Sequence, residues 1–247
     1  MLPISVVIVT KNEEINIEDA LKSVSDAKEI VVIDAFSTDR TVEICRKYTD
    51  KVFQHEWQGF SRQKQTAVDY AEGEWVLLLD ADERVTDDLR QEILGVILNT
   101  DCNGFYVPRK NFFIGKWIRH GGWWPDHTLR LFRKNSAHLV PREVHEQVAV
   151  DGTVGYLRNP LKHYTYTSIS DYLHRMDRYS SLASIEIRKK HDSAGLIFLV
   201  VKPISMFLKM YIIRGGFLDG KYGFLLAGLY SYYTFLKYAK TWEKQVN

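Results

Sequence analysis

The sequence predicts an α/β fold in which a Rossmann-like, mainly parallel central sheet is followed by C-terminal helices. Short runs of apolar, often β-branched residues alternate with amphipathic, helix-like segments over residues 4–79. Most of these runs pass directly into polar residues, as the carboxyl ends of strands do in an open parallel sheet. From residue 168 onward the apolar residues follow helical spacing to the end of the chain.

The first part of the chain predicts strands and helices in strict alternation. Apolar runs predict the strands, at residues 4–9, 29–34, 52–53 and 75–79. Capping and breaking residues predict the helices between them, with Asn16 as a cap, residues 37–39 as turn and cap, and a third helix over residues 59–72 that Gly73 ends. Polar side chains stand at the strand ends, where we expect one ligand crevice: Thr10, Asn12, Glu13, Asp34, Asp80 and Asp82.

Asp80 and Asp82 follow an unbroken apolar run that reads as a fully buried strand. In an extended chain the side chains of residues i and i+2 share one side, so both carboxylates could face one ligand. We predict that this ligand is a divalent metal, Mn²⁺ or Mg²⁺, carrying a diphosphate. The sequence has neither a Gly-rich dinucleotide fingerprint after the first strand nor a P-loop, so a metal and side chains would have to hold the phosphates.

The middle of the chain predicts one further helix, capped by Thr86, and two strands. The strands are expected at residues 105–109 and 128–133, the second with its basic residues on one side. Residues 111–126, between them, are dense in glycine and aromatic residues and are predicted to form a loop. Such a loop could bind a sugar, because aromatic faces pack on pyranose C–H faces, or it could plug the core.

The C-terminal part is basic and helical. Residues 188–247 hold ten Lys/Arg against three Asp/Glu, although the formal net charge of the whole chain is only +2. Residues 194–213 are long enough to span a bilayer, but Lys202 and Lys209 fall inside them. We therefore expect an amphipathic helix lying in the plane of an anionic membrane, with packing on the catalytic domain or on another subunit as the alternative. The predicted domains are residues 1–167 and 168–247.

Composition is that of a folded protein with an ordinary core, at 45% apolar and 26% charged residues. Cys45 and Cys102 are too few for a disulfide framework or a zinc cluster and indicate a reducing compartment. The apolar N-terminus lacks a basic leader, so it is interpreted as a strand and not as a signal peptide. We expect a cytoplasmic protein, peripheral on the inner face of the cytoplasmic membrane, without a nucleic-acid partner and of open oligomeric state.

Three segments resemble, in order and spacing, the opening of glycosyltransferase family 2: residues 4–13, 31–41 and 71–83. Later segments look like the lipopolysaccharide core β-glucosyltransferase branch of that family: residues 124–133, 144–146 and 216–224. Each motif alone is weak evidence. The ordered set covers most of the chain and is specific.

The resemblance implies a GT-A fold, a nucleotide-diphosphate sugar donor such as a UDP-sugar, a divalent metal and inversion at the anomeric carbon. Asp34 matches the acidic position that meets the donor base, Asp80 the position towards the ribose and Asp82 the metal ligand. Asp126 matches the general base. The chain departs from the family at Ala35-Phe36, at Lys64-Gln65, which replace Arg-Asn, and at Pro125, which replaces a Glu.

Several residues carry open alternatives. Glu146 is a rival base, and Arg142 with His145 could close over the diphosphate. His163 could be a further metal ligand or a structural histidine. Arg62 and Lys64 could contact the donor phosphate or base, or lie on a solvated helix face. Thr10, Asn12 and Glu13 complete the predicted donor site.

The predicted function is transfer of a hexose, with glucose as our prediction, to a saccharide or lipid-linked saccharide such as lipopolysaccharide core. One alternative is an aspartyl-phosphate phosphohydrolase, whose nucleophile also lies in an Asp-x-Asp after a buried strand. Against it, two strand and helix units precede the motif and the later Lys and Gly-Asp-x-x-x-Asp set is missing. A catalytically silent membrane scaffold is a second alternative, which the intact carboxylates argue against.

Overall fold

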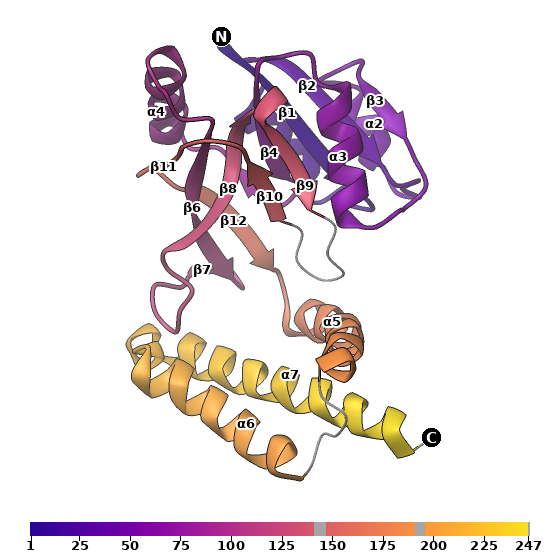
Figure 1. The fold of residues 1–247 in the computed structure, drawn as a ribbon, viewed down its shortest axis with the longest axis vertical. Coiled ribbons are helices and arrows are strands. Elements are labelled where there is room, and N and C mark those ends of the chain that lie inside the picture. Colours follow the sequence, from indigo (N-terminus) through magenta and orange to yellow (C-terminus); the bar gives the residue numbers. More distant parts are fainter. Residues whose placement is uncertain (141–146, 191–195, 247) are drawn as a thin grey trace. The chain divides into compact units, whose positions relative to one another are not determined.

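The computed structural model, which describes residues 1–140, 147–190 and 196–246, contains one large mixed sheet (Figure 1). Ten strands belong to it among these residues: β1 (Leu2–Thr10), β2 (Ala27–Asp34), β3 (Val52–Gln54), β4 (Trp75–Asp80), β5 (Glu83–Arg84), β6 (Gly104–Phe113), β7 (Lys116–Trp117), β8 (Asp126–Arg133), β11 (Val154–Tyr156) and β12 (Leu161–Tyr166). Their order is β3-β2-β1-β4-β8-β6-β12-β5, with β7 and β11 paired to β6. A separate antiparallel pair consists of β9 (Ala137–Val140) and β10 (Gln147–Val150).

The first four strands run parallel to one another, as their sequences predict. Beyond them β8 pairs with β4 in the antiparallel direction, so only the first half of the sheet is fully parallel. The α/β architecture and the alternation of the first four strands with helices along the chain are thus confirmed. The later half of the sheet is mixed because short hairpins replace crossover helices there.

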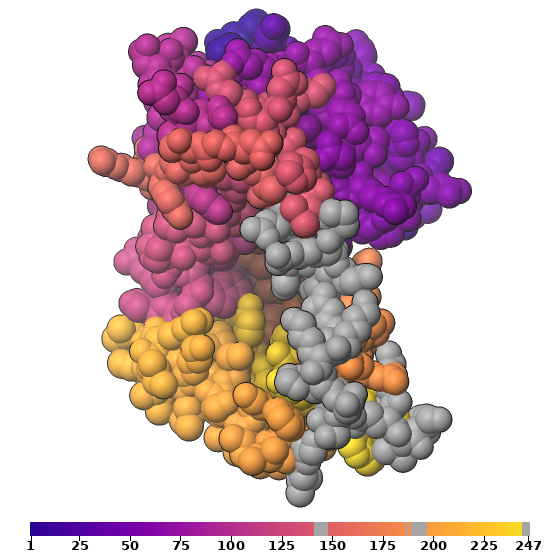
Figure 2. Space-filling view, viewed as in Figure 1, coloured from indigo at the N-terminus to yellow at the C-terminus, as the bar shows by residue number. Residues whose placement is uncertain are grey.

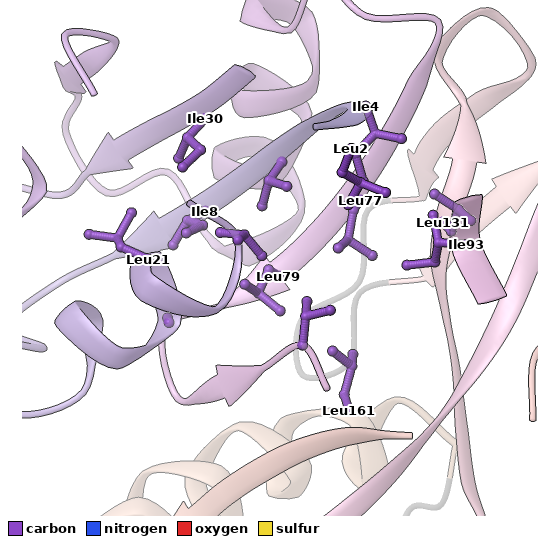
Figure 3. Packing of buried hydrophobic residues seen from close by; sticks show 14 of the residues in the cluster. Leu2, Ile4, Ile8, Leu21, Ile30, Leu77, Leu79, Ile93, Leu131 and Leu161 are labelled. Carbon is purple, nitrogen blue, oxygen red and sulfur yellow. The ribbon is translucent and has the colours of Figure 1, made fainter. Parts of the chain in front are cut away.

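Apolar side chains cover both faces of the parallel half, which explains why its strands are unbroken apolar runs. Alternate residues of β1, β2 and β4 point to opposite faces, as the period of a strand requires. One face packs under α1 (Ile17–Ser23), α2 (Thr41–Cys45) and α4 (Asp87–Leu98), and Figure 3 shows part of that cluster. The other face packs against α3 (Phe60–Tyr70) and the β9–β10 pair.

One predicted capping hydrogen bond and one predicted helix end differ from the structure. Asn16 precedes α1 but makes no capping hydrogen bond, because its amide donates to Glu13 Oε2 at 2.9 Å. Gly73 does not end α3, which finishes at Tyr70. A Cβ at Gly73 would lie 2.5 Å from Ser5 Oγ, so this glycine serves a close approach to β1. Thr86 does cap α4, accepting from the Leu89 N–H at 3.3 Å.

The segment predicted as an aromatic loop begins with regular structure. Strand β6 continues to Phe113, turns through Ile114 and Gly115, and pairs with β7. Both turn residues have positive φ, 48° and 74°, a conformation that a β-branched residue such as Ile114 rarely adopts. Composition alone gives no signal for that turn.

The C-terminal region is helical, as predicted, with α5 (Ile169–Lys190), α6 (Leu196–Leu208) and α7 (Lys221–Val246). A π-helical turn (Lys209–Ile213) and a 3₁₀ turn (Gly216–Asp219) join α6 to α7, which packs along both α5 and α6 (Figure 1). Among the residues that the structure describes, no helix has the length and apolar character needed to cross a membrane.

The chain divides into two compact units. Unit 1 contains residues 1–109 and 127–163, and unit 2 contains residues 110–126 and 164–247. The β6–β7 hairpin therefore groups with the C-terminal helices. Unit 2 has an aromatic core of its own, whose buried members are Phe113, Ile118, Trp123, Tyr166, Tyr172, Met176, Met210, Leu226 and Ala227.

Candidate active site

The carboxyl ends of β1, β2 and β4 meet at one edge of the sheet. Thr10 lies opposite Asp34 in the β1–β2 pairing, and Val9 lies opposite Asp80 in the β1–β4 pairing. The three polar strand ends that the sequence places in one crevice are therefore neighbours. The Thr10 hydroxyl is buried and has no hydrogen-bond partner among the described residues, so a ligand could supply the missing partner.

Asp80 is held by two cations from different elements. Lys64 Nζ of α3 lies 2.7 Å from Asp80 Oδ1, and Arg130 of β8 forms an ion pair with Asp80 Oδ2. Lys64 is only 2% exposed. Lys64 therefore does not lie on a solvated helix face, whereas Arg62, two residues earlier, is exposed.

Glu83, in the short strand β5, is a second carboxylate that contacts the same arginine. Its carboxylate accepts from Arg130 Nη2 at 2.7 Å and from the Asp80 backbone N–H at 3.0 Å, and Arg109 Nη1 lies at 3.3 Å. The Glu83 side chain is fully buried. Two carboxylates and three cations thus form one network, buried at Lys64, Arg130 and Glu83 and partly exposed at Asp80 and Arg109, that closes the chain between Asp80 and Glu83 into a tight turn.

The network sets the ionisation of Asp80. Burial alone would raise the pKa of this carboxyl, but the charges of Arg130 and Lys64 and their hydrogen bonds outweigh it and hold the pKa well below the usual range. A carboxyl whose folded-state pKa is depressed stabilises the fold at pH values above its unfolded pKa of about 3.9. That contribution is lost only as the pH falls through the lower, folded-state pKa.

Asp82 lies within this turn and faces His163. Their Oδ2 and Nε2 atoms lie 3.5 Å apart, and both side chains are largely buried. His163 is positioned by β12, where it pairs with Glu83 of β5 in the antiparallel direction. The sequence predicts Asp82 as a metal ligand and His163 as a candidate ligand or a structural histidine, and the fold brings the two side chains together.

The described residues contain no group of three or more His, Cys, Asp or Glu side chains that could hold a metal ion. Asp82 and His163 could together supply a carboxylate oxygen and an imidazole nitrogen, which suit Mn²⁺. Hard divalent cations commonly bind through one or two protein side chains, with phosphate oxygens and water completing the shell. The pair therefore fits a metal that is bound together with a diphosphate.

Other predicted donor residues shape the loops at this edge. Asp34 is fully buried and accepts from the Ser37 N–H at 2.8 Å, from the Ser37 hydroxyl and from Gln54 Nε2 at 3.2 Å. Asn12 Oδ1 accepts from the Thr38 N–H at 2.8 Å, and the Glu13 N–H donates to Thr41 Oγ1 at 2.8 Å. These contacts tie the loop after β1 to the loop after β2.

Phe36 stands out in the second of these loops. It has a φ of 54°, in the left-handed region that favours glycine, and 52% of its surface is exposed. Because the ring is half exposed, its packing contributes little to offset the free-energy cost of this backbone conformation. The sequence shows only that Phe36 departs from the family pattern at this position.

Asp126 belongs to unit 2, at the start of β8. Its Oδ2 accepts from Asn111 Nδ2 at 2.9 Å, and the same amide donates to the Trp123 carbonyl at 3.3 Å. Asn111 is buried in β6. One amide therefore fixes both the predicted base and the aromatic segment that precedes it.

Three predicted residues, Arg142, His145 and Glu146, lie outside the described residues. Sequence analysis in turn missed Glu83, Arg109, Arg130 and Asn111 as parts of the site. Placing Arg130 and Arg133 on one side of a strand was wrong, because residues three apart point to opposite sides. Arg130 enters the buried network, whereas Arg133 stacks on Trp75 and pairs with Glu74. The two-residue period of β8 is the signal in the sequence that places Arg130 and Arg133 on opposite sides.

Comparison with known proteins gives a consistent result. The model of the family described as Glycosyl transferase family 2 matches residues 5–165. A lipopolysaccharide core biosynthesis glycosyltransferase, LpsC of Rhizobium meliloti (strain 1021), is 28% identical and aligns over 98% of this chain and 93% of that protein. An uncharacterized glycosyltransferase of Rickettsia typhi is 30% identical over 98% of this chain and 88% of its own.

Among solved structures, S. aureus TarS 1-349 in complex with UDP-GlcNAc has a TM-score of 0.51 at 15% identity. The match covers 98% of this chain and 91% of that chain. At this level of identity the likeness concerns the fold.

The buried network predicts an unequal effect of two neighbouring arginines. Arg130→Met would leave Asp80 and Glu83 without their shared cation, so we expect the free energy of unfolding at pH 7 to fall by about 3–5 kcal/mol. Arg133→Met, on the same strand, removes a partly exposed pair with Glu74, a ring contact and a long hydrogen bond to the Thr100 carbonyl, and should cost about 1 kcal/mol. Urea denaturation followed by circular dichroism measures both. Equal losses of unfolding free energy in the two variants would contradict the larger contribution that we assign to the Arg130 contacts.

Proposed function

The chain belongs to glycosyltransferase family 2 and is a glycosyltransferase, and we propose that it transfers a hexose from a nucleotide-diphosphate sugar to a saccharide or lipid-linked saccharide. We further propose glucose as the sugar and lipopolysaccharide core as the acceptor class. The full-length likeness to a lipopolysaccharide core biosynthesis glycosyltransferase supports this acceptor. The observation that carries the proposal is the fixed turn from Asp80 to Glu83 at the end of β4, which presents Asp82 to His163.

Donor binding follows from the charges at this edge. Family membership favours glycosyl transfer over the aspartyl-phosphate phosphohydrolase and over a silent scaffold. Since Lys64 and Arg130 already occupy Asp80, we propose that Asp80 positions the turn and that its remaining surface meets the donor. Asp82 and His163 would hold Mn²⁺ or Mg²⁺. A bound divalent ion would stabilise the negative charge that develops on the leaving diphosphate.

The acceptor hydroxyl must lose its proton as the new bond forms, and we propose Asp126 as the general base. Asn111 supports this role because its Nδ2–H donates to one carboxylate oxygen, which orients the group. A single displacement would invert the anomeric centre. Glu146 stays the rival base.

We propose that unit 2 also attaches the enzyme to an anionic membrane surface. Apolar side chains that are 43% to 78% exposed follow one another along α6 and the π-helical turn: Ile197, Val200, Val201, Ile204, Leu208, Ile212 and Ile213. Figure 2 shows this orange to gold part of the chain at the molecular surface. Residues 193–218 contain Lys202, Lys209 and Arg214 but no Asp or Glu. An exposed apolar face whose charged neighbours are all cations is typical of a helix that lies in the plane of a membrane with anionic lipids.

The metal proposal predicts that Asp82→Asn lowers transfer by about 10²–10³-fold while the protein stays folded. Hydrolysis of UDP-glucose with Mn²⁺ or Mg²⁺ measures the rate, and calorimetric titration with Mn²⁺ in the presence of UDP measures the metal directly. Asp87→Asn, an exposed carboxylate at the start of α4, is the matched control. Full activity in the presence of a chelator would end the metal role.

The base proposal predicts a loss in turnover without a loss in donor binding. Asp126→Asn should lower kcat by about 10²–10⁴-fold, because no carboxylate accepts the acceptor proton, while the Kd for UDP-glucose stays within about twofold. Asp101→Asn, an exposed carboxylate outside the site, serves as control. An unchanged kcat would transfer the assignment to Glu146, which Glu146→Gln then tests.

The membrane proposal predicts that the double variant Lys202→Glu and Lys209→Glu binds vesicles containing phosphatidylglycerol at least about 30-fold more weakly, since each lysine near an anionic surface contributes about 1 kcal/mol. The double variant Lys22→Glu and Lys28→Glu, with exposed lysines of unit 1, is the matched control. Co-sedimentation measures both. Unchanged partitioning together with a stable dimer in ultracentrifugation would favour packing of α6 on a second copy.

A further inference from the structure

The β6–β7 hairpin carries a surface that the donor site does not use. The pairing of Phe112 with Trp117, continued by the hydrogen bond from the Ile118 N–H to the Asn111 carbonyl, puts alternate residues on one face. We call Lys110, Phe112, Trp117 and Arg119 the hairpin face. Trp124 joins it, because its ring meets Trp117 edge-on at 5.6 Å between centroids.

Two cations lie over the same indole. The Lys110 Nζ atom is 4.7 Å and the Arg119 Cζ atom is 4.2 Å from the Trp117 ring centroid. A guanidinium stacked on an aromatic ring keeps its in-plane N–H groups for other acceptors, in the fork that matches a carboxylate or a phosphate. The Trp117 Nε1 atom is itself buried without a hydrogen-bond partner among the described residues.

These cations have no acidic partner in the part of the chain that the structure describes. Neither Lys110 nor Arg119 forms an ion pair there, and residues 110–125 contain no Asp or Glu. The two nearest carboxylates of unit 2 along these contacts are engaged: Asp126 accepts from Asn111, and Asp219 accepts from backbone N–H groups. Like charges on one ring without a counter-charge favour binding of an anion.

The hairpin face is also held firmly. Asp219 accepts from the Arg119 N–H at 3.1 Å and from the His120 N–H at 2.8 Å, and the Gly121 N–H donates to the Arg214 carbonyl at 2.9 Å. Backbone contacts therefore fix the end of the hairpin to the segment that joins α6 and α7. A surface whose backbone is preorganised loses less entropy when it binds a ligand.

The hairpin face adjoins the proposed base through Trp124. The Trp124 ring meets Trp117, and Trp124 precedes Asp126 by two residues. Asn111, between Lys110 and Phe112, turns its side chain to the other side of β6, where it donates to Asp126. A general base must contact the group that it deprotonates, so residues tied to Asp126 belong to the acceptor side. We propose that the hairpin face binds an anionic group, a phosphate or a carboxylate, on the acceptor saccharide.

In this arrangement Arg119 and Lys110 hold the anion, while the aromatic rings of Trp124 and Phe112 offer flat apolar surface to the C–H face of the sugar. Phe112 already stacks on Tyr164 at 5.0 Å, which keeps its ring in place. The acceptor would thus be recognised by charge and by a sugar face together. The inference rests on the proposed function for its acceptor, but not on the metal or on the donor.

The test follows the indole N–H resonance of Trp117 in the full chain, assigned with Trp117→Phe, during titration with four probes. These are D-glucose 6-phosphate, D-glucuronate, D-glucose and inorganic phosphate. We expect the two anionic sugars to bind at least about tenfold more tightly than glucose. Arg119→Gln should remove about tenfold of that affinity. Lys116→Gln, on the opposite face of the same hairpin, should change it by less than about twofold.

Glucose binding as tightly as glucose 6-phosphate, or equal effects of the Arg119 and Lys116 variants, would overturn the proposal. Inorganic phosphate, or glycerol 1-phosphate added as a fifth probe, binding as tightly as glucose 6-phosphate would also overturn it, in favour of a simple anion or lipid headgroup site. UDP-glucose hydrolysis is measured on the same samples. Loss of hydrolysis with intact sugar binding would contradict the proposed donor chemistry alone, whereas intact hydrolysis without sugar binding would contradict this inference alone.

Discussion

The buried contacts of Arg130 with Asp80 and Glu83 are the constraint on which the candidate active site depends. They join β8 to the end of β4 and to β5, while Lys64 adds α3 and Arg109 adds β6. A buried charge that loses its partner is costly, so none of these elements can shift without the others. The two residues between Asp80 and Glu83 are therefore held in one backbone conformation, in which the Asp82 carboxylate points toward His163.

Much of the parallel half could be read from the sequence because each of its strands is buried on both faces. Continuous apolar runs such as residues 75–79 leave few other structures available, and the pairing then brings Thr10, Asp34 and Asp80 to one edge. The sequence also predicts Asp82 and, as a candidate, His163 as metal ligands; the fold brings them together, and their role stays a prediction. Contacts between residues far apart in the chain, such as Arg130 with Asp80, leave no local pattern.

The errors have equally local causes. The turn at Ile114 and Gly115 needs positive φ at a β-branched residue, a conformation that such residues rarely adopt. The sequence therefore predicts a loop where the hairpin forms. Asn16 had the right side chain for a cap, but the carboxylate of Glu13 competes for its amide. Gly73 looked like a helix stop because glycine is common there, whereas its missing side chain makes room for Ser5. In each case a tertiary contact outweighed a local preference.

The network at the end of β4 also has an electrostatic meaning. Among the described residues, Asp80 and Glu83 are matched by three cations, so the first carboxylate of the motif adds no net negative charge to the strand end. Asp82, the second carboxylate of the motif, faces His163. A cation at such a site gains most of its stabilisation from the phosphate oxygens that arrive with it. In the proposed site, a divalent ion would therefore bind more tightly together with the donor diphosphate than alone.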